Sequence, residues 1–123
     1  MTSAWTGDEL DTIGAAGEID IAPRRADGTV GRFTTIWIVR VGDDLYVRSY
    51  RGPRGSWYRA AQRTHEGRLR ANGNEHEIAF EDAPDASRAA VDTAYGAKYG
   101  RSSDVDAMIT DEAAATTMRL VPR

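Results

Sequence analysis

The sequence has no cysteine, so disulfides, thiolate metal sites and cysteine nucleophiles are excluded. It also has no apolar run close to the roughly 20 residues that span a bilayer. Its first ten residues lack the basic and apolar regions of a signal peptide. We therefore expect a cytoplasmic protein that does not associate with membranes. The chain is long enough for one hydrophobic core, so we expect a single domain over residues 1–123.

Familiar catalytic and metal-binding motifs are absent as well. The two histidines, His65 and His76, have no carboxylates around them at metal-ligand spacing, so we expect no metal site. The Gly-x-Ser-x-Gly elbow of serine hydrolases is missing. The segment Gly52-Pro-Arg-Gly55 is not followed by Gly-Lys-Ser/Thr, and no parallel βαβ unit surrounds it, so it is not a known nucleotide-binding loop. The catalytic residues are therefore left unassigned.

Positive charge is concentrated in one stretch of a chain whose net charge is −3. Between Asp44 and Glu66 there is no acidic residue, and the arginines there are Arg48, Arg51, Arg54, Arg59 and Arg63. The pattern predicts a strand over 45–50, a glycine loop, and a helix capped by Ser56. The free backbone N–H groups and the positive dipole end of this helix would then meet the guanidinium groups at the start of the helix. With the nearby Tyr46, Tyr50, Trp57 and Tyr58, this predicts a ligand that has a phosphate and a planar ring.

Two other interpretations of the basic stretch stay open. It could be a solvated basic face around a few core aromatics. Runs of arginine, glycine and aromatic residues also occur in nucleic-acid binders. The rest of the chain is acidic, and a nucleic-acid groove needs a longer basic track than one strand and loop supply. We therefore do not expect a nucleic-acid partner.

Periodicity and turn residues predict the elements of a small antiparallel barrel of the α+β class. Thr6 and Glu9 form a capping box, and the run Ile36–Val39 is apolar on both faces, which predicts a central strand. The expected elements are a helix from Thr6 to Gly14 or Gly17, strands over 18–22, 32–41 and 45–50, a helix over 56–63, strands over 68–72 and 75–81, a helix from Asp85 to Gly100, a loop with a helical turn or two over 104–115, and a strand over 116–121.

The predicted hairpin of strands 32–41 and 45–50 gathers arginines from two parts of the chain at the start of the Ser56 helix. The arginines concerned are Arg24, Arg25, Arg32, Arg51 and Arg54. Crowded cations repel each other, so an anion is expected among them. The alternative is that Asp20, Asp27 or a C-terminal acid pairs with some of them.

Longer segments carry a resemblance to known proteins. Residues 28–52 and 56–61 resemble the split β-barrel flavin and deazaflavin proteins, above all the deazaflavin-dependent nitroreductase branch. That branch has a Gly-x-x-Arg turn, a Thr-Thr-x-x-Trp strand, a Gly-Asp hairpin, a strand ending in Ser, a Gly loop and a Trp-containing helix, in this order. Residues 94–100 (Ala-Tyr-Gly-Ala-Lys-Tyr-Gly) and 115–123 are similar to those of an uncharacterised bacterial family related to that branch.

The resemblance implies a split β-barrel with about six strands and two or three packed helices, which binds deazaflavin or FMN. The resemblance further implies an oxidoreductase activity on a small organic acceptor. The cofactor-binding residues that it and the basic stretch suggest are Arg32, Thr34, Arg48, Ser49, Tyr50, Arg51, Gly52, Arg54, Trp57 and Tyr58. Arg32, Arg51 and Arg54 would hold the phosphate.

Departures from the nitroreductase pattern keep a cofactor-free binding module as the alternative. Thr35 stands where those proteins often have proline, and the Gly52-Pro53 loop is shorter than theirs. Related barrels often pair, so we also expect a homodimer, with Trp5 near the contact.

Overall fold

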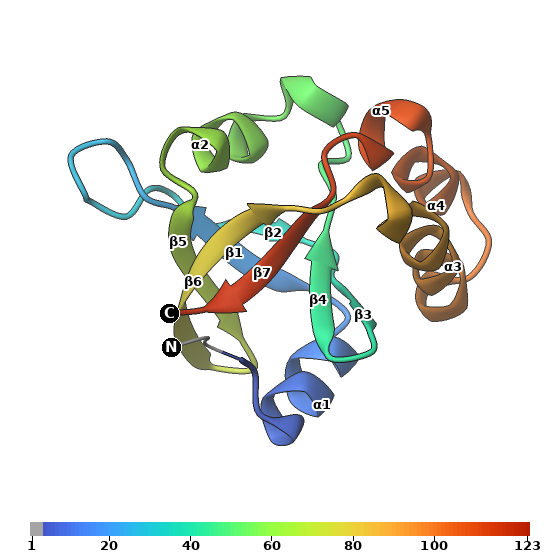
Figure 1. The fold of residues 1–123 in the computed structure, drawn as a ribbon, viewed down its shortest axis with the longest axis horizontal. Coiled ribbons are helices and arrows are strands. Elements are labelled where there is room, and N and C mark those ends of the chain that lie inside the picture. Colours follow the sequence, from blue (N-terminus) through green and yellow to red (C-terminus); the bar gives the residue numbers. More distant parts are fainter. Residues whose placement is uncertain (1–3) are drawn as a thin grey trace.

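All strands of residues 4–123, the part of the chain that the computed structural model describes, join in one antiparallel sheet. The strands are β1 (Ile19–Pro23), β2 (Thr34–Ile36), β3 (Val39–Val41), β4 (Asp44–Val47), β5 (Glu66–Ala71), β6 (Asn74–Asp82) and β7 (Met118–Pro122). The helices are α1 (Gly7–Ala15), α2 (Ser56–Thr64), α3 (Arg88–Tyr99), α4 (Ser103–Met108) and α5 (Asp111–Ala114). Figure 1 shows α1 and α2 at opposite ends of the sheet, with α3, α4 and α5 grouped on one side.

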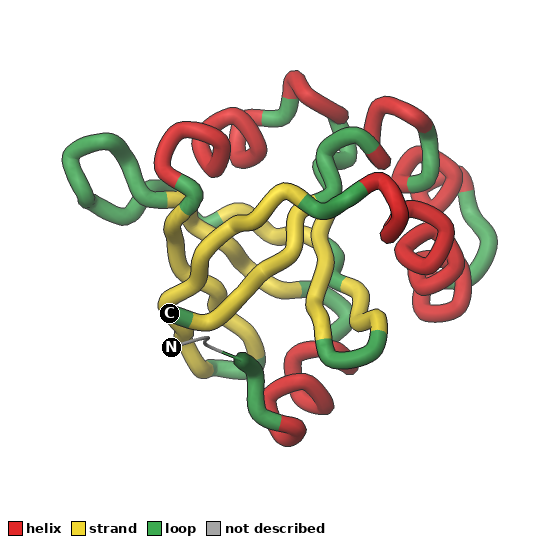
Figure 2. The backbone as a smooth tube through the Cα atoms, in the orientation of Figure 1, coloured by secondary structure: helices red, strands yellow, loops and turns green. Residues whose placement is uncertain are grey.

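The sheet is so strongly curved that its two edge strands are consecutive in the sequence, with only two residues between them. Its strand order is β2-β1-β5-β6-β7-β4-β3, so β2 and β3 are the edges. Only Trp37 and Ile38 separate these edge strands in the sequence. The chain therefore steps across the gap between the edges, and the strands enclose a common interior (Figure 2). This is the expected α+β split barrel, with seven strands and five α-helices in the described residues.

The predicted single strand over 32–41 is wrong in one respect. It is broken at Trp37 and Ile38, and its two halves are edge strands instead of one central strand. Ile38 lies in the barrel core, whereas Val39 packs outward against α3. The run is apolar on both faces because the interior covers one face and α3 covers the other. A central strand would bury Ile36 and Trp37 fully, but both are only half-buried because they border the gap.

The barrel interior is filled by aliphatic and aromatic side chains from all parts of the sheet. Among them are Ile19, Ile21, Leu45, Val47, Leu69, Ile78, Phe80 and Leu120, each at most 2% exposed. Each such side chain contributes about 1.5–3 kcal/mol by burial. Trp5 also belongs to this core, and its indole N–H donates to the Leu120 carbonyl at 2.8 Å. Trp5 therefore has little exposed surface left for the expected contact between subunits.

Several local signals are confirmed. The Thr6 hydroxyl accepts from the Glu9 N–H at 3.1 Å, and the Glu9 carboxylate accepts from the Thr6 N–H at 2.9 Å, so the capping box is present. The strands predicted over 68–72 and 75–81 are β5 and β6, and Asn72 and Gly73, both with positive φ, form the tight turn between them. Within residues 4–123, no helix combines the length and the apolar character needed to cross a bilayer.

Two predicted helix caps are wrong. Gly55, and not Ser56, occupies the N-cap position of α2, and no side chain caps that helix. Asp85 opens a single 3₁₀ turn over Asp85–Ser87, and α3 begins only at Arg88. Gly55 cannot cap with a side chain, so the first N–H groups of α2 stay available.

Candidate functional site

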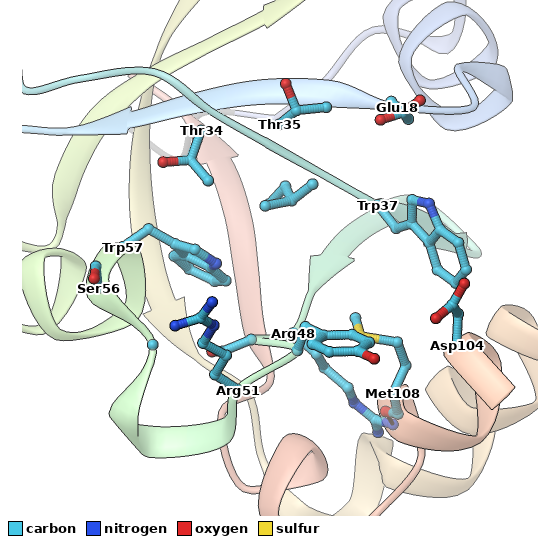
Figure 3. A pocket seen from close by; sticks show the side chains of 14 residues that line it. Glu18, Thr34, Thr35, Trp37, Arg48, Arg51, Ser56, Trp57, Asp104 and Met108 are labelled. Carbon is cyan, nitrogen blue, oxygen red and sulfur yellow. Dashed lines mark hydrogen bonds between the residues drawn. The ribbon is translucent and has the colours of Figure 1, made fainter.

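A cavity of about 340 Å³ opens between the edge strand β2 and the segment that follows β4. One wall comes from β2 and the step that follows it, the other from the segment after β4 and the start of α2, and α4 closes one end (Figure 3). The lining residues are Glu18, Thr34, Thr35, Ile36, Trp37, Arg48, Ser49, Tyr50, Arg51, Gly55, Ser56, Trp57, Asp104 and Met108. Because β2 is an edge strand, one row of its backbone polar groups has no partner strand.

A second cavity, of about 380 Å³, adjoins the first and shares Thr34, Ser56 and Trp57 with it. Its other walls carry Arg24, Arg25, Arg32 and Arg63. Both volumes lie within the range of about 300–1,000 Å³ that is usual for small-molecule sites. The two cavities adjoin at the start of α2, and we refer to them together as the groove.

The N-terminus of α2 lies between the two cavities without a side-chain cap. Its first turn contains no acidic residue, and Ser56 lines both cavities. The free N–H groups and the positive end of the helix dipole there favour an anion. Packing favours glycine at the N-cap of α2, because a Cβ on Gly55 would lie 2.2 Å from the Ser49 hydroxyl oxygen.

Most of the arginines that line the two cavities, unlike Arg24 and Arg48, form no ion pair within the described residues. In residues 4–123, ion pairs with carboxylates are formed by Arg24, Arg40, Arg48, Arg68, Arg70, Arg88, Arg119 and Arg123. Within the same residues, no ion pair is formed by Arg25, Arg32, Arg51, Arg54, Arg59 or Arg63. The field at the mouth of the groove is therefore positive, although the whole chain is acidic.

Arg48 lines the first cavity, but its positive charge is neutralised by an ion pair within the protein. Its guanidinium is fully buried and pairs with the carboxylate of Asp92. It also donates to the Thr117 hydroxyl at 2.8 Å and to the Met108 carbonyl at 3.0 Å. Figure 3 shows the side chain running toward Met108 and away from Trp57. Arg48 thus ties α3 and the α4 region to the sheet.

Ser49 and Tyr50 follow Arg48 and face the cavity in different ways. Ser49 is only 1% exposed, and its N–H donates to the Thr116 hydroxyl at 2.8 Å. Among the described residues, none hydrogen-bonds to its side-chain hydroxyl, so that group is free for a ligand. Tyr50 is 59% exposed at the rim, which leaves an aromatic face open to the cavity mouth.

Three of the candidate residues line neither cavity. Gly52 is buried beneath Glu112, and its positive φ of 65° explains the glycine. Arg54 is exposed on the outside of the loop. Tyr58 is half-buried against the barrel core, and burial raises the pKa of its hydroxyl, with the charge of Asp82 adding to the effect.

The sequence did not single out the opposite end of the first cavity. Trp37 stacks there on Tyr99, with ring centroids 4.0 Å apart and an angle of 5° between the planes. Glu18 and Asp104 lie at the same end in Figure 3. Burial raises the pKa of Tyr99, and the charge of Glu18 raises it further. No local pattern marks Glu18, Tyr99 or Asp104 as site residues, because the fold alone brings them to Trp37.

Metal binding has no support in the described chain. Within residues 4–123, no group of three or more histidine and acidic side chains could hold an ion. The lining of the two cavities offers guanidinium groups, backbone N–H groups, hydroxyls and aromatic rings to a ligand.

Residues 9–120 match the bacterial family described as "Uncharacterized protein conserved in bacteria (DUF2255)". The chain belongs to this family. A search of curated protein sequences gives no match. The family membership confirms the resemblance that residues 94–100 and 115–123 suggested.

Solved structures share the fold of this DUF2255 protein over nearly all of its length. One is an F420 reductase, with a TM-score of 0.56 and 18% identity, covering 93% of this chain and 90% of that one. A second is an FAD-binding protein from Mesorhizobium loti, with a TM-score of 0.60, 13% identity and coverages of 99% and 91%. A third is a putative 5-nitroimidazole antibiotic resistance protein from Bacteroides thetaiotaomicron, with a TM-score of 0.55, 14% identity and coverages of 98% and 80%. Identities this low show a common fold, and the split barrel is confirmed.

Proposed function

We propose that this protein binds a flavin-type cofactor, either deazaflavin or FMN, along the groove formed by the two cavities. We further propose that it is an oxidoreductase acting on a small organic acceptor. The observation that carries the proposal is the uncapped start of α2, which lies between two adjoining cavities whose walls carry Arg25, Arg32, Arg51 and Arg63, arginines that form no ion pair within residues 4–123. The shared fold of an F420 reductase and an FAD-binding protein supports a ligand of this class.

The residues of the first cavity fit a planar, polar ring. Trp57 lies at the junction of the two cavities and offers an apolar wall, and Tyr50 offers an exposed ring at the rim. The buried Ser49 hydroxyl and the free edge of β2 supply hydrogen-bonding groups for a heterocycle. Arg48 shapes this wall and does not add charge, because Asp92 neutralises it.

The phosphate of the cofactor fits the basic side of the groove. Arg51 lines the first cavity, and Arg32 lines the second. Ser56 lies between them at the start of α2, where N–H groups can bind phosphate oxygens. Each guanidinium hydrogen bond to a charged oxygen contributes about 1.5–3 kcal/mol.

When bound, a flavin or deazaflavin supplies the hydride-transfer chemistry, and the protein binds and orients it. Trp57 and Met108 are buried and give the cavity apolar walls against which a ring can pack. The Ser49 hydroxyl holds a proton that it can donate in a hydrogen bond to a ring or ribityl oxygen.

Titration of the purified protein with FMN and with F420, followed by fluorescence, tests the proposal. The parent should bind one of them with a Kd below about 100 µM, a ceiling that corresponds to about 5.5 kcal/mol. Arg51→Ala should weaken that binding by about 10- to 150-fold, the equivalent of one charged hydrogen bond. Arg54→Ala is the matched control, since Arg54 lies three residues away but outside both cavities. Absence of binding, or equal losses in both variants, would contradict the proposal.

A cofactor-free binding module is the second candidate. It is favoured by the position of Gly52, Arg54 and Tyr58 outside both cavities, because the resemblance and the basic stretch placed them in a cofactor site. In that case inorganic phosphate should bind to the groove, whereas FMN and F420 should bind no better than phosphate alone.

A further inference from the structure

The motif over residues 94–100 has no part in the proposed function. It forms the last turns of α3, which packs against β3 and is capped by Gly100. Its polar side chains are Tyr95, Lys98 and Tyr99, and within residues 4–123 none of them lines either cavity of the groove. Lys98 and Tyr99 contact instead the two residues that separate β2 from β3.

The step between the sheet edges receives hydrogen bonds from these two side chains. Ile38 is fully buried and lies outside the strands, and buried backbone polar groups need partners. Its N–H donates to the Tyr99 hydroxyl at 3.3 Å, and its carbonyl accepts from the Lys98 ammonium at 2.6 Å. The Tyr99 hydroxyl can donate its own proton to the Gly17 carbonyl at 2.9 Å or to the Ile38 carbonyl at 3.1 Å. The end of α3 thus supplies hydrogen bonds that a neighbouring strand supplies elsewhere in the sheet.

The same contacts fix the place of Trp37, which directly precedes Ile38. The indole stacks on the Tyr99 ring, with centroids 4.0 Å apart and an angle of 5° between the planes. Trp37 also lines the first cavity, at the end away from α2 (Figure 3). Gly17, whose carbonyl lies beside the Tyr99 hydroxyl, is followed by Glu18, another lining residue. Tyr99 therefore joins two separate segments of the cavity wall.

Trp37 depends on this support because it belongs to neither edge strand. Its side chain is only half-buried, and the chain on both sides of it is at an edge of the sheet. A displaced step would remove the end wall of the cavity. A ligand that packs in the closed cavity binds only the fraction of molecules in which the step is in place, so its apparent affinity falls with that fraction.

We propose that Tyr99 and Lys98 are positioning residues for the cofactor cavity, and that they hold the Trp37–Ile38 step where the indole forms the end wall. The assignment rests on the proposed function, because the ligand whose binding they support is the flavin-type cofactor. Tyr99 acts through its stacked ring and its hydroxyl, and Lys98 acts through the Ile38 carbonyl. The motif over residues 94–100 thereby acquires a role in ligand binding without contact to the ligand.

Three variants separate the ring, the hydroxyl and the ammonium. Tyr99→Leu removes the ring and the hydroxyl, Tyr99→Phe removes the hydroxyl alone, and Lys98→Met removes the ammonium. Tyr95→Phe is the matched control. Tyr95 lies one turn earlier on α3, and its buried hydroxyl has no hydrogen-bond partner among the described residues, so its removal should leave the step in place.

Each variant is measured in two ways: by fluorescence titration with FMN and F420, and by fluorine NMR of protein labelled with fluorinated tryptophan. The chain has three tryptophans, and Trp37→Phe identifies the resonance of Trp37. In the protein without cofactor, Tyr99→Leu should shift or broaden that resonance. It should also weaken cofactor binding by about five- to twentyfold, the scale of one aromatic pair and one hydrogen bond.

Tyr99→Phe and Lys98→Met should each weaken binding by about two- to tenfold, the scale of one hydrogen bond. Tyr95→Phe should change neither the affinity nor the resonance. Both measurements are made at a temperature at which urea unfolding shows every variant to be folded, so that a loss of stability alone does not weaken binding. If Tyr99→Leu does not fold, Tyr99→Phe and Lys98→Met provide the test, because both keep the stacked ring.

Three results would overturn the inference. They are a Trp37 resonance that is the same in all variants, a resonance that moves without any loss of affinity, and an affinity that falls equally in Tyr95→Phe. A parent protein that binds neither FMN nor F420 contradicts the proposed function instead. The fluorine spectra alone then decide whether the end of α3 holds Trp37 in place, since they need no cofactor.

Discussion

Arg48 allows the fold and the candidate site to be tested separately. Its side chain is fully buried, whereas that of its partner Asp92 is 30% exposed. Arg48→Met keeps most of the volume but leaves the Asp92 carboxylate, the Thr117 hydroxyl and the Met108 carbonyl without their donor. Breaking a buried ion pair from one side costs about 3–5 kcal/mol. Because Asp92 is partly hydrated, we expect about 3 kcal/mol, a large share of the roughly 5–15 kcal/mol of a typical domain.

The assay is urea unfolding followed by the fluorescence of the three tryptophans. Asp92→Asn should destabilise the protein by a similar amount, since it leaves the Arg48 guanidinium buried without a counter-charge. The Arg48→Met/Asp92→Leu double variant should recover part of the loss, because neither charge then remains uncompensated. The reasoning is refuted if Arg48→Met unfolds within about 1 kcal/mol of the parent while its affinity for FMN or F420 collapses. Arg48 would then be a cofactor ligand.

Three further predictions concern backbone, charge and assembly. Gly55→Ala should lower the free energy of unfolding by about 1–3 kcal/mol and weaken cofactor binding, because its Cβ would meet the Ser49 hydroxyl. Gly17→Ala is the control: there is open space around its Cβ, so cofactor affinity should not change. Burial lowers the pKa of Lys98 from 10.5 to about 8, so the unfolded chain binds more protons in that interval. The stability of the parent relative to Lys98→Met should therefore rise from pH 8 to 10.5, and a flat difference in urea melts would contradict this. Finally, we expect a homodimer, and a scattering mass equal to the 13.5 kDa of one chain would exclude it.

The sequence predicted elements that local chemistry determines. The Thr6 and Glu9 pair fixes the start of α1 because both hydrogen bonds are made within one turn. The strands predicted over 68–72 and 75–81 are present as β5 and β6, and the turn between them uses Gly73 with a positive φ that glycine adopts without strain. The apolar run from Ile36 to Val39 predicted coverage on both faces, but it could not show that the strand breaks at the gap between the sheet edges.

The candidate site was only partly predictable, because its chemistry depends on distant partners. The sequence located a basic stretch, and it could not show that Arg48 turns to Asp92, forty-four residues later, while Arg51 faces the cavity. The contribution of Asp104 was equally hidden, since the segment around it was expected to be mostly loop. Long-range pairing thus decides which cations and acids of the chain are left free for a ligand.

The crystal structure of the protein grown with FMN or F420 is the most direct test of a cofactor site in the groove around α2. We predict that the phosphate lies at the start of α2, within hydrogen-bonding distance of the Ser56 N–H and of the Arg51 or Arg32 guanidinium. The ring should lie in the first cavity between Trp57 and the Ser49 hydroxyl. A cofactor bound on another face of the barrel, or a groove without cofactor at saturating concentration, would contradict the account.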